Sequence, residues 1–130
     1  MKETVVTWVD GNKYSADMSC GEFTISSKKT DKGSMKPPEM ILASLGTCGG
    51  LFLKPVLKEM GIEWDDFKLS LSWEKAKAPK LFKKINMHYE IEAEISPEKL
   101  EEALEESHRR CLVMNTLDSD IEIETTFEIK

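Results

Sequence analysis

The sequence predicts an α+β fold with mostly antiparallel sheets around a buried central helix. Three observations lead to this prediction. Three short stretches of alternating polarity come first, and a long uncharged stretch, residues 40–53, follows a proline pair. After it, three more alternating stretches enclose a second helical pattern. The expected order is therefore β-β-β-α-β-β-α-β.

The first three strands are expected at residues 4–9, 13–18 and 21–27. Side chains of opposite polarity alternate along them, as in a strand with two different faces. Asp10-Gly11 separates the first two strands, and this dipeptide favours a hairpin because glycine accepts a positive φ.

The central helix is expected to begin at Pro37-Pro38 and to end near Met60, with Gly61 as a left-handed stop. Residues 40–53 are apolar on every side of this helix, so we expect it to be buried all round. One short chain offers little cover for its far side. A second copy of the chain is the expected partner, which predicts a homodimer.

Two long strands follow, alternating over residues 67–73 and 85–95. Ser96-Pro97 is a typical start for a second helix, whose apolar line leads to Cys111. The last strand is expected at residues 121–129. Each of these strands should have one face exposed to water.

The whole chain of 130 residues is long enough for a single domain with its own core. Its formal charge of −6 and the lack of a dense basic stretch argue against nucleic-acid binding. The start of the chain has no apolar signal region, and residues 40–53 are too few to span a bilayer. We therefore expect a cytoplasmic protein that does not bind membranes. Three cysteines, an odd number, fit a reducing compartment.

Two cysteines stand in recognisable surroundings. Cys48 lies in the uncharged helix, among Gly46, Gly49 and Gly50. Three glycines so close together destabilise a helix by roughly 1 kcal/mol each relative to alanine, which suggests a close approach by a backbone or a substrate. Cys111 lies on the inward line of the second helix. Either thiol could simply be a small packed side chain, and the glycines could serve helix packing. Two inward thiols on neighbouring helices could also meet as a redox pair.

The order of these motifs resembles the OsmC/Ohr family of thiol-dependent peroxide reductases. The resemblance rests on the helix from Pro37-Pro38-Glu39 to Cys48 and on the later run from Cys111 to Leu117. It implies an intertwined OsmC-like homodimer, with Cys48 as the peroxidatic thiolate and Cys111 as the resolving thiol. It also implies no bound cofactor and an external reductant of the dithiol or lipoyl type.

The chain departs from the family pattern around the first thiol. Family peroxidases use an N-terminal arginine, held by a glutamate, to stabilise the thiolate, whereas the first arginine here is Arg109. Lys28, twenty residues before Cys48, is the candidate replacement, with Lys29 as a substitute. The family glutamate position is Pro38, and Glu39 follows it.

Glu39 and Cys48 are nine residues apart, which places them on opposite sides of a straight helix. If Glu39 takes part in the chemistry, it is therefore expected to serve the partner's Cys48 across a dimer interface. A favourable interaction with the helix dipole is the alternative role for Glu39. Cys20 matches no family thiol. His88 and His108 have no partner at zinc-ligand spacing, so no metal site is expected.

Two functions remain open from the sequence. The first is reduction of hydroperoxides by a Cys48–Cys111 pair, organic ones in view of the apolar surroundings. The second is a protein of the same fold that binds a small apolar ligand with little or no peroxidase turnover. The missing N-terminal arginine keeps the second function open, and a reactive thiolate would distinguish the two. Apolar residues near the thiols are Met40, Leu45, Leu51, Phe52, Leu112 and Met114.

Overall fold

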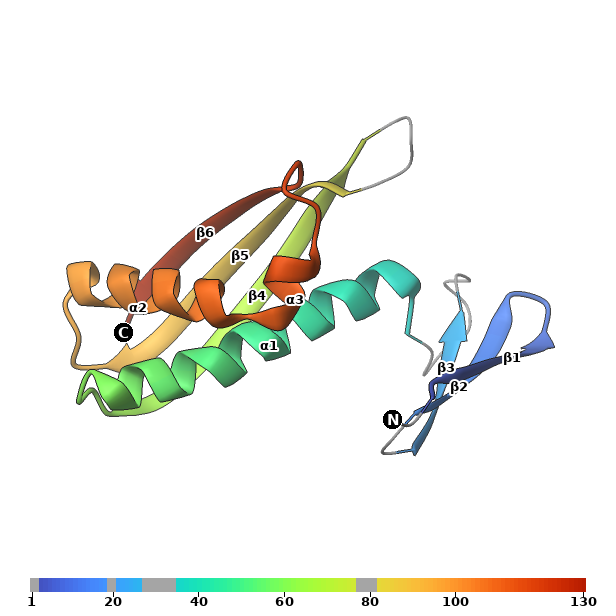
Figure 1. Ribbon diagram of the computed structural model, residues 1–130, viewed down its shortest axis with the longest axis horizontal. Helices are drawn as coiled ribbons and strands as arrows, with labels where there is room; N and C mark the ends of the chain where they lie inside the picture. The colour runs from blue at the N-terminus through green and yellow to red at the C-terminus, as the bar shows by residue number, and fades with distance from the viewer. Residues whose placement is uncertain (1–2, 19–20, 27–34, 77–81) are drawn as a thin grey trace. The chain divides into compact units, whose positions relative to one another are not determined.

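The computed structural model describes residues 3–18, 21–26, 35–76 and 82–130. They form two compact units, Met1–Ile41 and Leu42–Lys130, and helix α1 (Pro37–Glu59) begins in the first unit and continues into the second (Figure 1). The predicted order of elements is confirmed, with one short helix added near the end. The single domain over residues 1–130 stays a prediction.

The first unit contains a three-stranded antiparallel sheet in the order β1-β2-β3. Its strands are β1 (Val5–Asp10), β2 (Lys13–Met18) and β3 (Gly21–Ser26). Gly11 takes the positive φ of +50° that the Asp10-Gly11 hairpin predicts. Every residue of β1 is exposed in the single chain, including the apolar ones.

The second unit is built on the sheet β4-β5-β6. β4 (Trp64–Lys75) pairs antiparallel with β5 (Phe82–Ala93), and β5 pairs parallel with β6 (Glu122–Ile129). The parallel pair follows from the connection, because a helical crossover returns the chain to the same end of the sheet. Three of the four strand pairs are antiparallel, as the sequence predicts.

One face of this sheet carries the core. The side chains of Ile85, Met87, Tyr89 and Ile91 alternate along β5 and are at most 1% exposed. They pack in one cluster with apolar residues of both long helices. The two helices, α1 and α2 (Pro97–Arg110), therefore lie on the same face of the sheet (Figure 1).

Helix α1 is buried on one side in the single chain. One face packs into the core, with Leu45, Leu53 and Leu57 fully buried. The opposite side is open in the single chain, where Leu51 is 61% exposed. Cover of this side by a second copy of the chain stays a prediction.

By length and composition, α1 could also cross a membrane, since it has 23 residues and a stretch of mean hydropathy 1.6. In this structure α1 packs against the sheet as a core helix. Core helices often have the same length and hydropathy as membrane-spanning helices. The cytoplasmic location stays a prediction.

The second helix begins as predicted, with Ser96 as its N-cap and Pro97 in its first turn. The Ser96 hydroxyl accepts a hydrogen bond from the backbone N–H of Lys99 at 3.2 Å. The helix ends at Arg110, and Cys111 has an extended backbone. A five-residue helix, α3 (Leu112–Thr116), follows at once, and it was not among the predicted elements.

Candidate functional site

The two thiols singled out in the sequence meet in the second unit. Cys48 comes from the middle of α1, and Cys111 comes from the junction between α2 and α3. Both are free thiols, and they lie close enough for Cys48 to act on the pKa of Cys111. The packing of both helices on one sheet face brings these distant residues together. The roles of Cys48 as the peroxidatic thiol and Cys111 as the resolving thiol stay predictions.

The surroundings make the two thiols unequal. Cys111 is fully buried, whereas Cys48 is partly exposed. Burial raises the pKa of the Cys111 thiol, and the neighbouring Cys48 thiol raises this pKa further. The backbone N–H of Met114, 3.4 Å from Cys111 Sγ, acts in the opposite direction. Cys111 therefore keeps its proton at neutral pH, and Cys48 is the thiol that solvent can reach.

A tyrosine and a histidine lie beside the thiols. The Tyr89 hydroxyl, from β5, is 2.9 Å from Nε2 of His108, from α2. Tyr89 is 1% exposed, and its pKa is raised by burial and then by the nearby charge of Cys111. Burial lowers the pKa of His108, so the imidazole is neutral at pH 7.

Neither Tyr89 nor His108 was predicted as a residue of the site. A signal was present, because a tyrosine on the apolar face of a strand needs a hydrogen-bond partner for its hydroxyl.

The three glycines of α1 are explained by the sheet. A Cβ at Gly46 would lie 2.8 Å from Leu71 Cδ1, and one at Gly50 would lie 3.2 Å from Phe67 Cε2. At Gly49 the Cβ would lie 3.1 Å from the Tyr89 hydroxyl oxygen. The glycines thus let β4 and β5 side chains approach the helix. The glycines therefore serve packing of the helix, as the alternative interpretation of the sequence predicted, and the element packed against them is a sheet.

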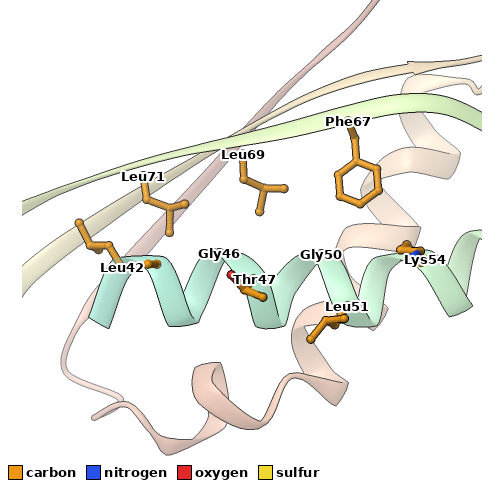
Figure 2. Close-up of a pocket in the computed structure, with 10 residues that line it drawn as sticks. Leu42, Gly46, Thr47, Gly50, Leu51, Lys54, Phe67, Leu69 and Leu71 are labelled. Carbon is orange, nitrogen blue, oxygen red and sulfur yellow. The ribbon is translucent and has the colours of Figure 1, made fainter. Parts of the chain in front are cut away.

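An apolar groove of about 460 Å³ runs between α1 and the edge strand β4 (Figure 2). Leu69, Leu71 and Phe67 point from β4 toward the helix (Figure 2). The groove lining does not include Cys48, so this cavity is distinct from the thiol pair. Its helix side is formed by Leu42, Ala43, Gly46, Thr47, Gly50, Leu51 and Lys54.

The other predicted site residues are not gathered at the thiols. Glu39 is exposed in the first turn of α1, where its carboxylate lies 3.9 Å from the Lys36 ammonium. This position suits the favourable interaction with the helix dipole. Lys28, Lys29 and Cys20 lie outside the described residues, and their roles stay predictions.

The two arginines next to Cys111 bind carboxylates. Arg109 forms an ion pair with Glu106, and Arg110 is bound to Glu106 and Glu59. The Arg110–Glu59 bond, at 2.8 Å, joins the C-terminal ends of α2 and α1. Because these guanidinium groups already serve carboxylates, they are poor candidates for the charge that activates Cys48.

The polar face of the sheet offers one further cluster of titratable groups. Potential ligand atoms of His88, Glu90 and Glu128 lie within 4.8 Å of one another. Glu90 already pairs with Lys68 and Lys130, whose positive charges oppose binding of a cation. His88 Nδ1 is 2.7 Å from the Thr126 hydroxyl. The absence of a metal site stays a prediction.

Solved structures with the same fold superpose on nearly the whole length of this chain. A hypothetical protein from Aquifex aeolicus superposes with a TM-score of 0.85 and 24% identity, covering 100% of this chain and 96% of its own. A Legionella pneumophila protein described as an organic hydroperoxide resistance protein OsmC gives a TM-score of 0.78 and 15% identity, covering 98% of both chains.

The sequence comparisons agree with this fold. An uncharacterized Methanocaldococcus jannaschii protein, MJ0573, is 29% identical over 94 residues. The match covers 70% of this chain and 49% of that protein, so the chain spans about half the length of this relative. Residues 29–126 match the family of OsmC-like proteins, a range that contains both thiols and most of the described fold. The chain therefore belongs to the OsmC-like protein family.

Proposed function

We propose that this protein reduces organic hydroperoxides through Cys48 and Cys111. The observation that carries the proposal is the close approach of one partly exposed thiol and one buried thiol. A peroxide from solvent can meet Cys48, whereas Cys111 is shielded and has Cys48 as its neighbour. Two-cysteine peroxide chemistry needs this inequality, because one thiol reacts first and the other resolves the product.

In the first step the Cys48 thiolate attacks the terminal oxygen of the hydroperoxide. The O–O bond breaks, an S–O bond forms, and the leaving alkoxide takes a proton and departs as an alcohol. The peroxide gains two electrons and the sulfur loses two. The product at Cys48 is a sulfenic acid.

In the second step Cys111 attacks the Cys48 sulfenic acid. An S–S bond forms, the S–O bond breaks, and the hydroxyl leaves as water with the proton of Cys111. An external dithiol, of the lipoyl type, then reduces the disulfide by two thiol–disulfide exchanges and is itself oxidised to a disulfide.

Two further observations support this function. The chain belongs to the OsmC-like family, and the Legionella pneumophila protein of the same fold is called an organic hydroperoxide resistance protein. The helix around Cys48 is also apolar, with Leu45 and Phe52 three residues before and four after it. Apolar surroundings favour an alkyl hydroperoxide over hydrogen peroxide.

The test adds one equivalent of cumene hydroperoxide to the reduced protein and maps its thiols by mass spectrometry. We expect an intrachain Cys48–Cys111 disulfide and a free Cys20. Cys48→Ser should show no oxidation, and Cys111→Ser should stop at a sulfenic acid that a 1,3-diketone traps. Steady-state turnover should be faster with a dithiol than with a monothiol. Unmodified Cys48 and Cys111 after peroxide treatment would contradict the proposal.

The apolar groove supports the second candidate function, binding of a small apolar ligand without turnover. It is large enough for such a ligand and does not include Cys48. Under this alternative the thiols stay reduced in peroxide, and a fluorescent fatty-acid probe binds with an affinity that Leu51→Lys weakens. Binding that is indifferent to Leu51→Lys would argue against the groove.

A further inference from the structure

The second chemical step needs a base that the two thiols do not supply. Cys111 is fully buried and keeps its proton, yet a thiolate is the attacking form of a cysteine. Within the described residues, Cys111 has as polar neighbours the Cys48 thiol and the backbone N–H groups of Val113 and Met114. None of these accepts the proton that Cys111 must lose while Cys48 is a sulfenic acid.

The Tyr89–His108 pair lies where it could accept the proton of Cys111. The Tyr89 hydroxyl lies beside Gly49, the residue that follows Cys48, and the charge of Cys111 acts on it. Its oxygen is 2.9 Å from Nε2 of a neutral imidazole. The backbone N–H of Cys111 also donates to the His108 carbonyl at 3.2 Å, which fixes the short chain segment between the two side chains.

The two arginines that follow His108 bind carboxylates. Arg109 and Arg110 on α2 bind Glu106 and Glu59. Among the described residues, Cys111 is the charged group that acts on the pKa of Tyr89, and burial alone shifts the pKa of His108.

We propose that Tyr89 and His108 move the proton during disulfide formation, an inference that rests on the proposed peroxide reduction. As Cys111 is deprotonated, the Tyr89 oxygen takes its proton and gives its own to His108 Nε2. The Cys111 thiolate then attacks the Cys48 sulfenic acid, forming the S–S bond and breaking the S–O bond. The departing hydroxide receives the proton back through Tyr89, so water leaves and the pair returns to its starting state. His108 acts through Tyr89 and is a positioning residue.

The experiment measures the two steps separately. Sulfenic acid formation is followed in the Cys111→Ser protein by trapping with a 1,3-diketone, alone and combined with Tyr89→Phe or His108→Gln. Disulfide formation is followed by rapid acid quench and mass spectrometry in chains that keep both cysteines. His88→Gln is the matched control, because His88 lies on the polar sheet face and binds Thr126.

We expect Tyr89→Phe and His108→Gln to leave sulfenic acid formation unchanged and to slow disulfide formation on the order of 100-fold, within the usual range for general acid–base catalysis. His88→Gln should change neither step. In the unsubstituted protein, disulfide formation should slow as pH falls and His108 becomes protonated, and His108→Gln should remove this dependence.

Disulfide formation at an unchanged rate and pH profile in His108→Gln would overturn the inference while leaving the proposed function intact. An unsubstituted protein that forms no sulfenic acid would overturn both. Circular dichroism on each variant separates misfolding from a chemical effect, and Tyr89→Phe, which removes one oxygen, is the second independent variant.

Discussion

Cys48 and Cys111 show how the same side chain acquires two different properties from its place in the fold. Cys48 sits at mid-helix with partial exposure, and Cys111 sits in a buried junction between two helices. The sequence indicates both thiols because each lies in a distinctive local pattern. The sequence does not reveal which thiol is buried more completely, because burial depends on the helices and the sheet that pack around each thiol.

Tyr89 and His108 show the limit of local patterns. Each fits its own element, a strand residue on the apolar face and a helix residue near the C-terminal end. Their hydrogen bond joins β5 to α2, and only the packing of those elements creates it. An unpaired hydroxyl on an apolar face predicts a partner but not which one.

Lys28 is the residue we expect to stabilise the Cys48 thiolate. A nearby positive charge favours the ionised form of an acid by roughly tenfold or more. Lys28→Met should therefore slow alkylation of Cys48 by iodoacetamide at neutral pH, and Lys28→Arg should preserve or raise the rate.

Arg110→Met is the comparison variant for this measurement. Because Arg110 already binds Glu59 and Glu106, we expect its loss to leave the pH dependence of Cys48 alkylation unchanged. A Lys28→Met profile identical to that of the unsubstituted protein would mean that the charge comes from another residue.

At the scale of elements, the close contact between α1 and the sheet depends on glycines, and each glycine lies against a different side chain of the sheet. Gly49 faces the hydroxyl of the fully buried Tyr89, whereas Gly46 faces the end of the Leu71 side chain, which lines an open groove. A rigid ring cannot move aside as easily as a leucine methyl. The two positions should therefore respond differently to an added methyl group.

Gly49→Ala should lower the thermal midpoint, and Gly46→Ala should leave it unchanged or raise it. Alanine favours a helix by about 1 kcal/mol over glycine. At Gly49, overpacking of about 1–3 kcal/mol and disturbance of the Tyr89–His108 bond exceed that gain. Calorimetry on both variants checks the order, and a Gly46→Ala protein that melts below Gly49→Ala would contradict it.

At the scale of the whole molecule, apolar side chains remain uncovered in the single chain. Trp8 is 63% exposed in the first unit, and Leu51 and Leu112 are 61% and 71% exposed in the second. Large exposed apolar surface on a protein usually marks an interaction site. This observation supports the expected homodimer, which would also let Glu39 act on the partner's Cys48.

We expect a stable dimer at micromolar concentration in sedimentation velocity. Leu51→Lys should shift the protein toward monomer, because it places a charge on the exposed side of α1. Glu101→Lys, on the exposed side of α2, is the matched control and should remain dimeric. An unsubstituted protein that sediments as a monomer would contradict both the predicted dimer and the predicted action of Glu39 on the partner's Cys48.

The sequence by itself determined the order of the elements, most of their boundaries and the two thiols. These features are local, because side-chain periodicity, proline, glycine and capping residues act within a few positions of the chain. The short helix α3 escaped prediction, since Cys111 interrupts the pattern that leads into it.

The tertiary structure decided which distant groups share a site. Packing both long helices on one sheet face placed Cys48 against Cys111, paired Tyr89 with His108, and tied Arg110 to Glu59. It also showed that the glycines of α1 admit side chains from the sheet. The physical reason is that burial and hydrogen bonding between elements depend on three-dimensional contact, which no single stretch of sequence contains.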